Sequence, residues 1–219
     1  MNELTSTEHL VPPPWKLKGD GLILLYRFSP DFVRNQGWLT AEMGEFRGGL
    51  GALMLVDYET SGVGPYREVL FIPGRFKLGS VRAHSISKIY VSTQPSIVSG
   101  RANWGIPKEH AEFRRTHHDA VQGWQISTGG HDFLKISYTP GKLPFRVWTF
   151  PFFAPLVQRL DGKTFVSRIR AHGVCKLATI HDLQIDPAYL PDVTRAELLG
   201  AIRATKFTLT FPVPRVIPD

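Results

Sequence analysis

A lysine near the middle of the chain has the setting that most favours covalent chemistry. Lys108 directly follows the segment Trp104–Pro107, which contains an aromatic residue, a glycine, an isoleucine and a proline. We therefore expect its stem to be held among apolar neighbours. Burial shifts a lysine toward the neutral amine, which is the nucleophile that forms a Schiff base with a ketone. The alternative is a surface lysine that begins a polar patch with Glu109 and His110.

Glu109 is the neighbour that bears most directly on this chemistry. A carboxylate close to the Lys108 amine would stabilise the ammonium and oppose its activation. However, consecutive residues of an extended segment point to opposite faces. We therefore expect Lys108 to enter a pocket while Glu109 faces away from it, so that burial is the main cause of activation.

Two segments of the chain resemble the active-site region of the acetoacetate decarboxylase superfamily. In the stretch from Tyr90 to Lys108, a tyrosine precedes the pair Gly100-Arg101 and then the pair Pro107-Lys108. Upstream, residues 57–68 read Asp-Tyr-Glu-Thr-Ser-Gly-Val-Gly-Pro-Tyr-Arg-Glu, which is similar to the family's Thr-Ser-Gly-Leu-Gly-x-Tyr-x-Glu segment. The tail from Phe211 to Ile217 also resembles the family's closing strand.

This resemblance implies roles for particular residues. Lys108 matches the family's Schiff-base lysine, and Glu68 matches an acidic active-site residue that shuttles protons or positions the substrate. Arg67 or Arg101 would meet a substrate carboxylate, although Arg101 is equally suited to a structural bond that holds the lysine loop. The residues expected to contact substrate are Arg67, Arg101, Leu53 and Trp104.

The chain also departs from the family pattern. Glu109 replaces the second lysine of the family's Pro-Lys-Lys motif, and Leu53 stands where the family has a further acid. The family's upstream arginine has no clear counterpart near Gly19. A leucine in place of an acid would make the pocket drier and favour a bulkier or more apolar substrate than acetoacetate.

The function implied by the resemblance is that of a Schiff-base-forming lyase acting on a keto acid, specifically a decarboxylase of a β-keto acid larger or more apolar than acetoacetate. The same imine also permits aldol addition and dehydration, so a Schiff-base aldolase or dehydratase is one alternative. A noncatalytic barrel that binds an apolar small molecule is another. We expect no cofactor and no metal ion.

Other catalytic and metal-binding signatures are weak. His110, Glu112, His117 and His118 form the densest group of potential ligands, but their spacing matches no zinc motif. A single cysteine, Cys175, excludes an internal disulfide.

Composition limits the possible partners. The formal net charge is +7 with a pI near 9.7, yet the basic residues are scattered rather than gathered along one face, so we expect no nucleic-acid partner. The longest apolar stretches, Leu22 to Leu25 and Leu50 to Val56, are too short to cross a bilayer, and we expect no membrane partner. We expect a cytoplasmic homo-oligomer.

The elements that must position these residues are mainly strands. β-rich segments recur at short intervals between glycines and prolines, which predicts a single domain over 1–219, an antiparallel β-barrel or double sheet with a few short helices. An extended arm is expected over 1–20, and a tight turn at Gly129-Gly130. The expected helices are Pro95 to Ala102, Pro155 to Leu160 and a segment beginning at the capping box Thr194–Glu197.

Overall fold

The computed structural model describes residues 10–78, 81–149 and 155–218. Within these ranges the chain forms sixteen strands in two sheets and only two α-helices. The mainly β, double-sheet class predicted from the spacing of the β-rich segments is therefore confirmed. No helix in the described ranges is long and apolar enough to cross a membrane.

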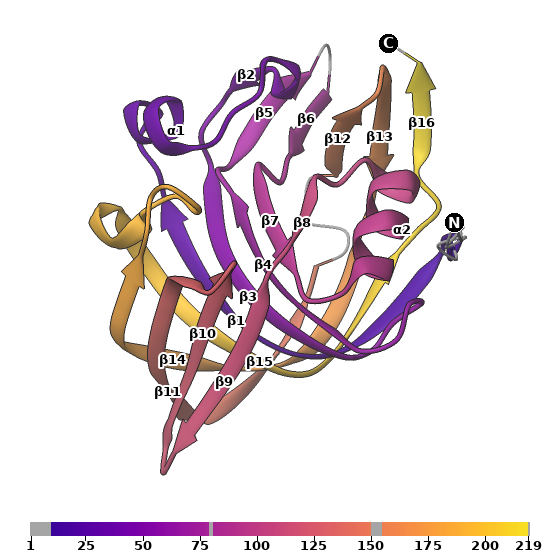
Figure 1. Ribbon diagram of the computed structural model, residues 1–219. Helices are drawn as coiled ribbons and strands as arrows, with labels where there is room; N and C mark the ends of the chain where they lie inside the picture. The colour runs from indigo at the N-terminus through magenta and orange to yellow at the C-terminus, as the bar shows by residue number, and fades with distance from the viewer. Residues whose placement is uncertain (1–9, 79–80, 150–154, 219) are drawn as a thin grey trace, which may run out of the picture.

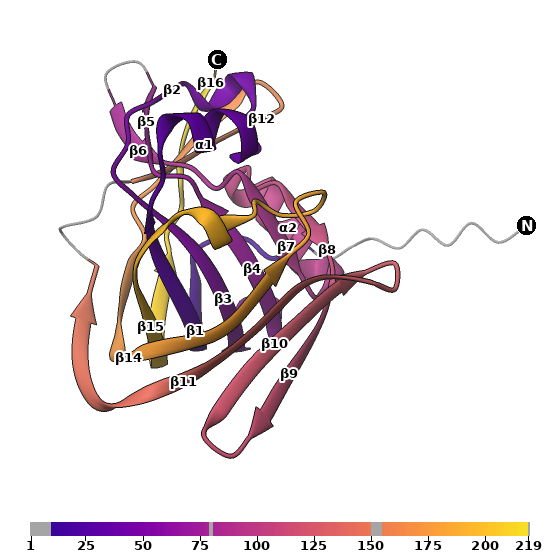
Figure 2. The same ribbon diagram turned by 90° about the vertical axis from the view of Figure 1, so that its left-hand side faces the viewer.

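The larger sheet has ten strands and curls into a trough (Figures 1 and 2). Its strands pair in antiparallel fashion except for β7 and β8, which are parallel. In spatial order they are β8 (Lys108–His110), β7 (Lys88–Val91), β4 (Tyr66–Ile72), β3 (Leu50–Thr60), β1 (Trp15–Arg27), β15 (Glu197–Phe211), β14 (Arg170–Ile185), β11 (His131–Trp148), β10 (Val121–Thr128) and β9 (Glu112–His118).

The smaller sheet has six strands, and the helices are short. In Figure 1, α2 lies beside β7 and β8. The strands of the smaller sheet are, in spatial order, β16 (Arg215–Pro218), β13 (Lys163–Ser167), β12 (Leu156–Leu160), β6 (Val81–His84), β5 (Arg75–Leu78) and β2 (Glu45–Phe46). The helices are α1 (Pro30–Gln36) and α2 (Gln94–Trp104), with 3₁₀ turns at Ala41–Met43 and Val193–Arg195.

Two apolar cores lie on opposite faces of the larger sheet. The barrel core lies on the concave face of the curled sheet. The helix-side core lies on the face that α2 covers. Because side chains alternate along a strand, β1, β3 and β4 contribute to both. The barrel core includes Leu22, Leu24, Leu53, Leu55, Val69, Phe71, Tyr90, Trp124 and Ile126, and the helix-side core includes Trp15, Leu17, Val56, Tyr58, Tyr66, Leu70, Ile89, Val91, Ile97, Trp104 and Ile106.

Two of the predicted local elements are confirmed. Gly129 and Gly130 have φ values of 56° and 79°, and β10 and β11 pair on either side of them. The helix expected from Pro95 to Ala102 is α2, which extends two residues further to Trp104. It ends because Gly105 adopts the left-handed conformation, at φ 64°.

Two predicted helices are wrong. The segment after Thr194 forms only one 3₁₀ turn, and Glu197 begins the fifteen-residue strand β15. Pairing with β1 and β14 along its length outweighs the local capping signal. Leu156–Leu160, also expected as helix, is strand β12 because it pairs with β13.

The extended arm expected over 1–20 is wrong for its last six residues, 15–20. Residues 1–9 lie outside the described ranges, and β1 begins at Trp15. Trp15 is buried, with its ring centroid 4.9 Å from that of Trp104. Residues 15–20 therefore belong to the sheet rather than to an arm.

Candidate active site

Lys108 is held at the junction of α2 and β8. Gly105 turns the chain out of α2, and Lys108 then pairs with Ile89 in the parallel β7–β8 ladder. The Nε atom of Arg101, in the last turn of α2, donates a 3.0 Å hydrogen bond to the Lys108 carbonyl. The register with Ile89 places the Lys108 side chain on the helix-side core, where only 4% of its surface is exposed.

One face of α2 lies directly against the lysine side chain. Ser96 and Gly100 are four residues apart and so share a face of the helix. The Lys108 amine donates a 2.9 Å hydrogen bond to Ser96 Oγ. A Cβ atom at Gly100 would come within 2.7 Å of Lys108 Cδ and 2.8 Å of Cε. Glycine at position 100 therefore leaves the space through which the lysine reaches Ser96.

Strands β3 and β4 supply the acidic and phenolic groups. Glu68 Oε2 lies 3.7 Å from the Lys108 amine, and both side chains are almost fully buried. The Tyr58 hydroxyl donates a 2.9 Å hydrogen bond to Glu68 Oε1. The Tyr66 hydroxyl is 3.4 Å from the Lys108 amine, which also lies 4.8 Å from the centre of the Tyr66 ring. The structure thus brings Lys108 and Glu68 together, as expected for a shared site.

Burial controls the ionisation of these groups. It lowers the pKa of Lys108 below the ordinary lysine value of 10.5, and the Glu68 carboxylate partly offsets this effect. Burial, and secondarily the charge of Glu68, raise the pKa of both Tyr58 and Tyr66 well above the ordinary tyrosine value. The two phenols therefore stay protonated at neutral pH, and Tyr58 remains a donor to Glu68.

Glu109 points away from Lys108, as the alternation of an extended segment predicts. It pairs across the ladder with Tyr90, on the face of the barrel core. Its carboxylate makes a 2.6 Å ion pair with Lys88, whose ammonium also lies 4.2 Å from the Trp38 ring centre. The carboxylate that contacts the Lys108 amine is that of Glu68.

Leu53 and Arg67 lie on the opposite face of the sheet from Lys108. Leu53 belongs to the barrel core. Arg67 adjoins Glu68 on β4 and so points the other way, with its Nε atom 3.2 Å from Asp57. The structure brings neither residue to the amine, and Leu53 therefore says nothing about the size or polarity of the substrate.

Arg101 and Trp104 hold α2 in place. Arg101 is exposed and bonds to the Lys108 carbonyl, which matches the structural alternative for this arginine. Trp104 lies in the helix-side core and donates a 2.8 Å hydrogen bond to the Pro212 carbonyl. Both residues fix the backbone from which the lysine side chain projects.

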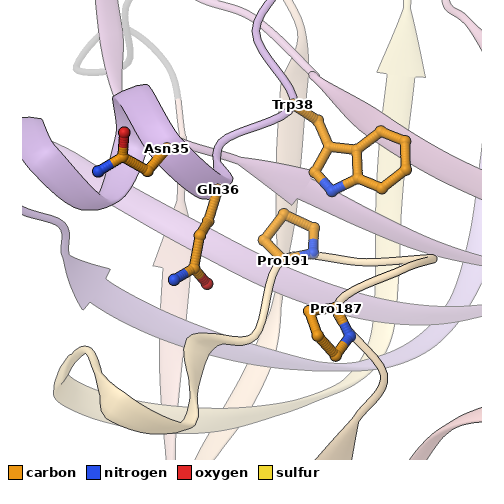
Figure 3. A pocket seen from close by; sticks show the side chains of 5 residues that line it. All are labelled: Asn35, Gln36, Trp38, Pro187 and Pro191. Carbon is orange, nitrogen blue, oxygen red and sulfur yellow. The ribbon is translucent and has the colours of Figure 1, made fainter.

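A cavity of about 350 Å³ lies elsewhere, between α1 and the loop that follows β14. Figure 3 shows Trp38 next to the two prolines of that loop, with the α1 side chains at the other end. The Trp38 ring contacts the Lys88 ammonium, which pairs with Glu109. Because Glu109 and Lys108 point to opposite faces of β8, this cavity is separate from Lys108. Its lining residues are Asn35, Gln36, Trp38, Pro187 and Pro191.

Ser96, Tyr58 and Tyr66 were not identified from the sequence as site residues. The predicted helix did contain a usable signal for Ser96, because Ser96 and Gly100 are small residues at the i, i+4 spacing of one helix face. Tyr58 and Tyr66 both lie within the family-like segment, residues 57–68, but their closeness to Lys108 depends on how β3 pairs with β4. The described residues hold no cluster of three or more His, Cys, Asp or Glu side chains suited to a metal ion.

Comparison with known proteins identifies the family. The acetoacetate decarboxylase (ADC) family model matches residues 2–147, well over half of the chain. The chain belongs to this family. No curated protein sequence matches it.

Solved structures share the fold of this ADC-family chain at low sequence identity. Acetoacetate decarboxylase from Legionella pneumophila is 15% identical with a TM-score of 0.70, covering 95% of this chain and 88% of that one. The enduracididine biosynthesis enzyme MppR, complexed with pyruvate, is 15% identical with a TM-score of 0.68, covering 100% and 95%. An acetoacetate decarboxylase-like enzyme from Sphingomonas wittichii is 12% identical with a TM-score of 0.67, covering 100% and 99%.

Proposed function

We propose that this protein is an enzyme in which Lys108 forms a Schiff base with a keto acid. The proposed reaction is the decarboxylation of a β-keto acid, so that the enzyme is a lyase. The observation that carries the proposal is the buried Lys108 amine, which contacts Ser96 and Glu68 and lies on the opposite face of β8 from Glu109. Such an amine is poised to lose its proton and attack a carbonyl carbon.

The reaction follows from imine chemistry. The neutral Lys108 nitrogen bonds to the substrate carbonyl carbon, and loss of water gives a protonated imine. The bond between the α-carbon and the carboxylate then breaks, and carbon dioxide leaves. The electron pair of that bond passes into the imine to form an enamine. Protonation of the enamine carbon and hydrolysis then release the ketone and restore Lys108.

Glu68 is the group placed to move protons in this sequence. Its Oε2 atom is 3.7 Å from the lysine nitrogen, while Tyr58 binds its Oε1 atom and orients the carboxylate. Glu68 would accept the ammonium proton before attack and return a proton during dehydration. Ser96 holds the amine on the α2 side, so that the nitrogen keeps one orientation during attack.

An aldolase or dehydratase reaction on the same lysine is the second candidate. It is favoured by the MppR comparison, because that enzyme is also known in complex with the condensation product of pyruvate and imidazole 4-carboxaldehyde. An enamine on Lys108 would attack an aldehyde carbon instead of accepting a proton. Both candidates share the covalent step, and they differ in whether carbon dioxide is released.

Borohydride trapping tests the proposal. The protein is incubated with acetoacetate, a longer β-keto acid or pyruvate, reduced with borohydride, and analysed by peptide mass spectrometry. The expected result is a substrate-derived mass on the peptide that contains Lys108, and none in Lys108→Ala. Carbon dioxide release separates decarboxylase from aldolase. An unmodified Lys108 with all three compounds would instead support a noncovalent small-molecule-binding protein.

A further inference from the structure

A network of charged side chains lies on the opposite face of the larger sheet from Lys108. We define the arginine network as Asp20, Asp57, Arg67, Arg115 and Arg203, which come from β1, β3, β4, β9 and β15. Arg115 Nη1 lies 3.0 Å from Asp57 and 3.2 Å from Asp20. Arg67 Nε is 3.2 Å from Asp57, and Arg203 Nη2 is 2.8 Å from Asp20. Each aspartate is therefore shared between two arginines.

The network is separated from the Lys108 site by the thickness of the sheet. Asp57 directly precedes Tyr58 on β3, and Arg67 directly precedes Glu68 on β4. Successive side chains of a strand point to opposite faces. Asp57 and Arg67 therefore lie on the face of the network, and Tyr58 and Glu68 lie on the face of Lys108. A ligand bound at the network would not be the carbonyl compound attacked by Lys108.

The network carries an excess of positive charge. Its three guanidinium groups face two carboxylates, which leaves a formal charge of +1. The Arg203 side chain is 6% exposed and is also bound by Gln122. Although burial disfavours the charged form, the carboxylates of Asp20 and Asp57 raise the pKa of Arg115, so the excess is not relieved by deprotonation. Partly buried charge of one sign is expected to attract a counter-ion.

The two more exposed arginines still have donors to offer a ligand. The Arg67 and Arg115 side chains are 41% and 30% exposed. Arg115 contacts both aspartates through Nη1, and Arg67 uses Nε for Asp57 and Nη1 for the Phe113 carbonyl. Within the described ranges, no hydrogen bond involves Nη2 of either residue. Guanidinium donors match the paired oxygens of carboxylate and phosphate groups.

We propose that Arg67 and Arg115 form a second binding site, distinct from the Lys108 site, for a small anion that carries a carboxylate or phosphate group. Asp57 binds both guanidinium groups, and Asp20, which binds Arg115, is itself bound by Arg203. The bound anion would neutralise the excess charge of the network.

Isothermal titration calorimetry of the full chain tests this site. Sodium phosphate and sodium acetate are titrated in separate arms at an ionic strength held constant with sodium chloride. We expect saturable binding of at least one anion, with a Kd at least tenfold weaker in Arg67→Gln and in Arg115→Gln. Arg146→Gln, which removes an exposed arginine of β11 outside the network, is the matched control and should bind as the unsubstituted protein does.

The outcomes separate this site from the proposed reaction. Lys108→Ala should lose borohydride trapping and keep anion binding. If Arg115→Gln does not fold, the more exposed Arg67→Gln decides the result. Stronger binding of phosphate or of acetate identifies the class of ligand. Absence of saturable binding by both anions, or equal weakening in Arg146→Gln, would overturn the proposal.

Discussion

Two carboxylates, those of Glu68 and Glu109, have different relations to the Lys108 amine. Glu68 is forty residues away along the chain but contacts the amine, whereas Glu109 is the next residue and pairs with Lys88 on the other face of β8. The ionisation of Lys108 is therefore governed by its burial and by Glu68. Adjacency in the sequence therefore does not determine which carboxylate lies next to the Lys108 amine.

The pH dependence of trapping tests this assignment. Only the neutral amine attacks a carbonyl, so the initial rate of borohydride-trapped adduct should rise with pH and level off above the pKa of Lys108, which burial places below 10.5. Because the Glu68 carboxylate raises that pKa, Glu68→Gln should move the midpoint of the rate profile to lower pH. Glu109→Gln should leave the midpoint unchanged. A shift in Glu109→Gln and none in Glu68→Gln would contradict the geometry.

At the scale of elements, α2 is the part that shapes the site. Its Ser96–Gly100 face contacts the lysine stem and amine, and its last turn binds the Lys108 carbonyl through Arg101. The helix is itself held by the residues before β1, where Asn103 donates a 2.7 Å hydrogen bond to the Val11 carbonyl. The position of the Lys108 amine thus depends on a helix and on a segment remote from it in the sequence.

Substitution of Gly100 tests the role of this helix face. Gly100→Ala should lower the initial rate of trapping by roughly tenfold or more, since a displacement of about 1 Å at a reacting group costs on the order of a hundredfold. The new methyl group would displace the flexible end of Lys108 rather than the backbone, so the thermal midpoint of unfolding should change little. Gly200→Ala, where a Cβ meets no atom within 4 Å, is the control. Equal trapping rates in the two variants would show that Gly100 is not required.

At the scale of the whole molecule, the aromatic contacts of Trp15 and Trp104 connect α2 to β1 and to β15. The Trp15 ring packs against Trp104, which in turn packs against Phe211 at the end of β15. Trp15 and Trp104 belong to the helix-side core, and Phe211 packs against it. The core that holds the Lys108 side chain therefore depends on β1 and β15, which lie far apart in the sequence.

Loss of Trp15 should destabilise the fold. Trp15→Ala is expected to lower the free energy of unfolding by about 3–5 kcal/mol, the cost of truncating a buried aromatic side chain. Trp148 is 59% exposed on β11, and Trp148→Ala should cost less than about 1 kcal/mol. Urea unfolding followed by circular dichroism measures both values. Similar losses in the two variants would mean that the Trp15 contacts contribute little.

The homo-oligomeric state and the single domain over 1–219 remain predictions at this scale. Light scattering of the purified full chain measures its mass directly. A mass of two or more times 24.6 kDa would support the expected homo-oligomer, and a mass of 24.6 kDa would contradict it.

Local features of the chain determined a substantial part of this picture. The glycines at 129 and 130 specify a tight turn because both adopt positive φ. The alternation of an extended segment places Lys108 and Glu109 on opposite faces, and the apolar residues before Lys108 predict its burial. These properties depend on a few consecutive residues, so they can be recognised without knowledge of the fold.

Only the tertiary structure decided which residues meet. The pairing of β3 with β4 places Leu53 and Arg67 away from the lysine and brings Tyr58 and Glu68 toward it. Pairing with β1 and β14 likewise makes a strand of the segment after Glu197, despite its helical capping pattern. Contacts between distant segments depend on strand register and on the faces that a curled sheet presents. That information is distributed over the whole chain and is not contained in any local pattern.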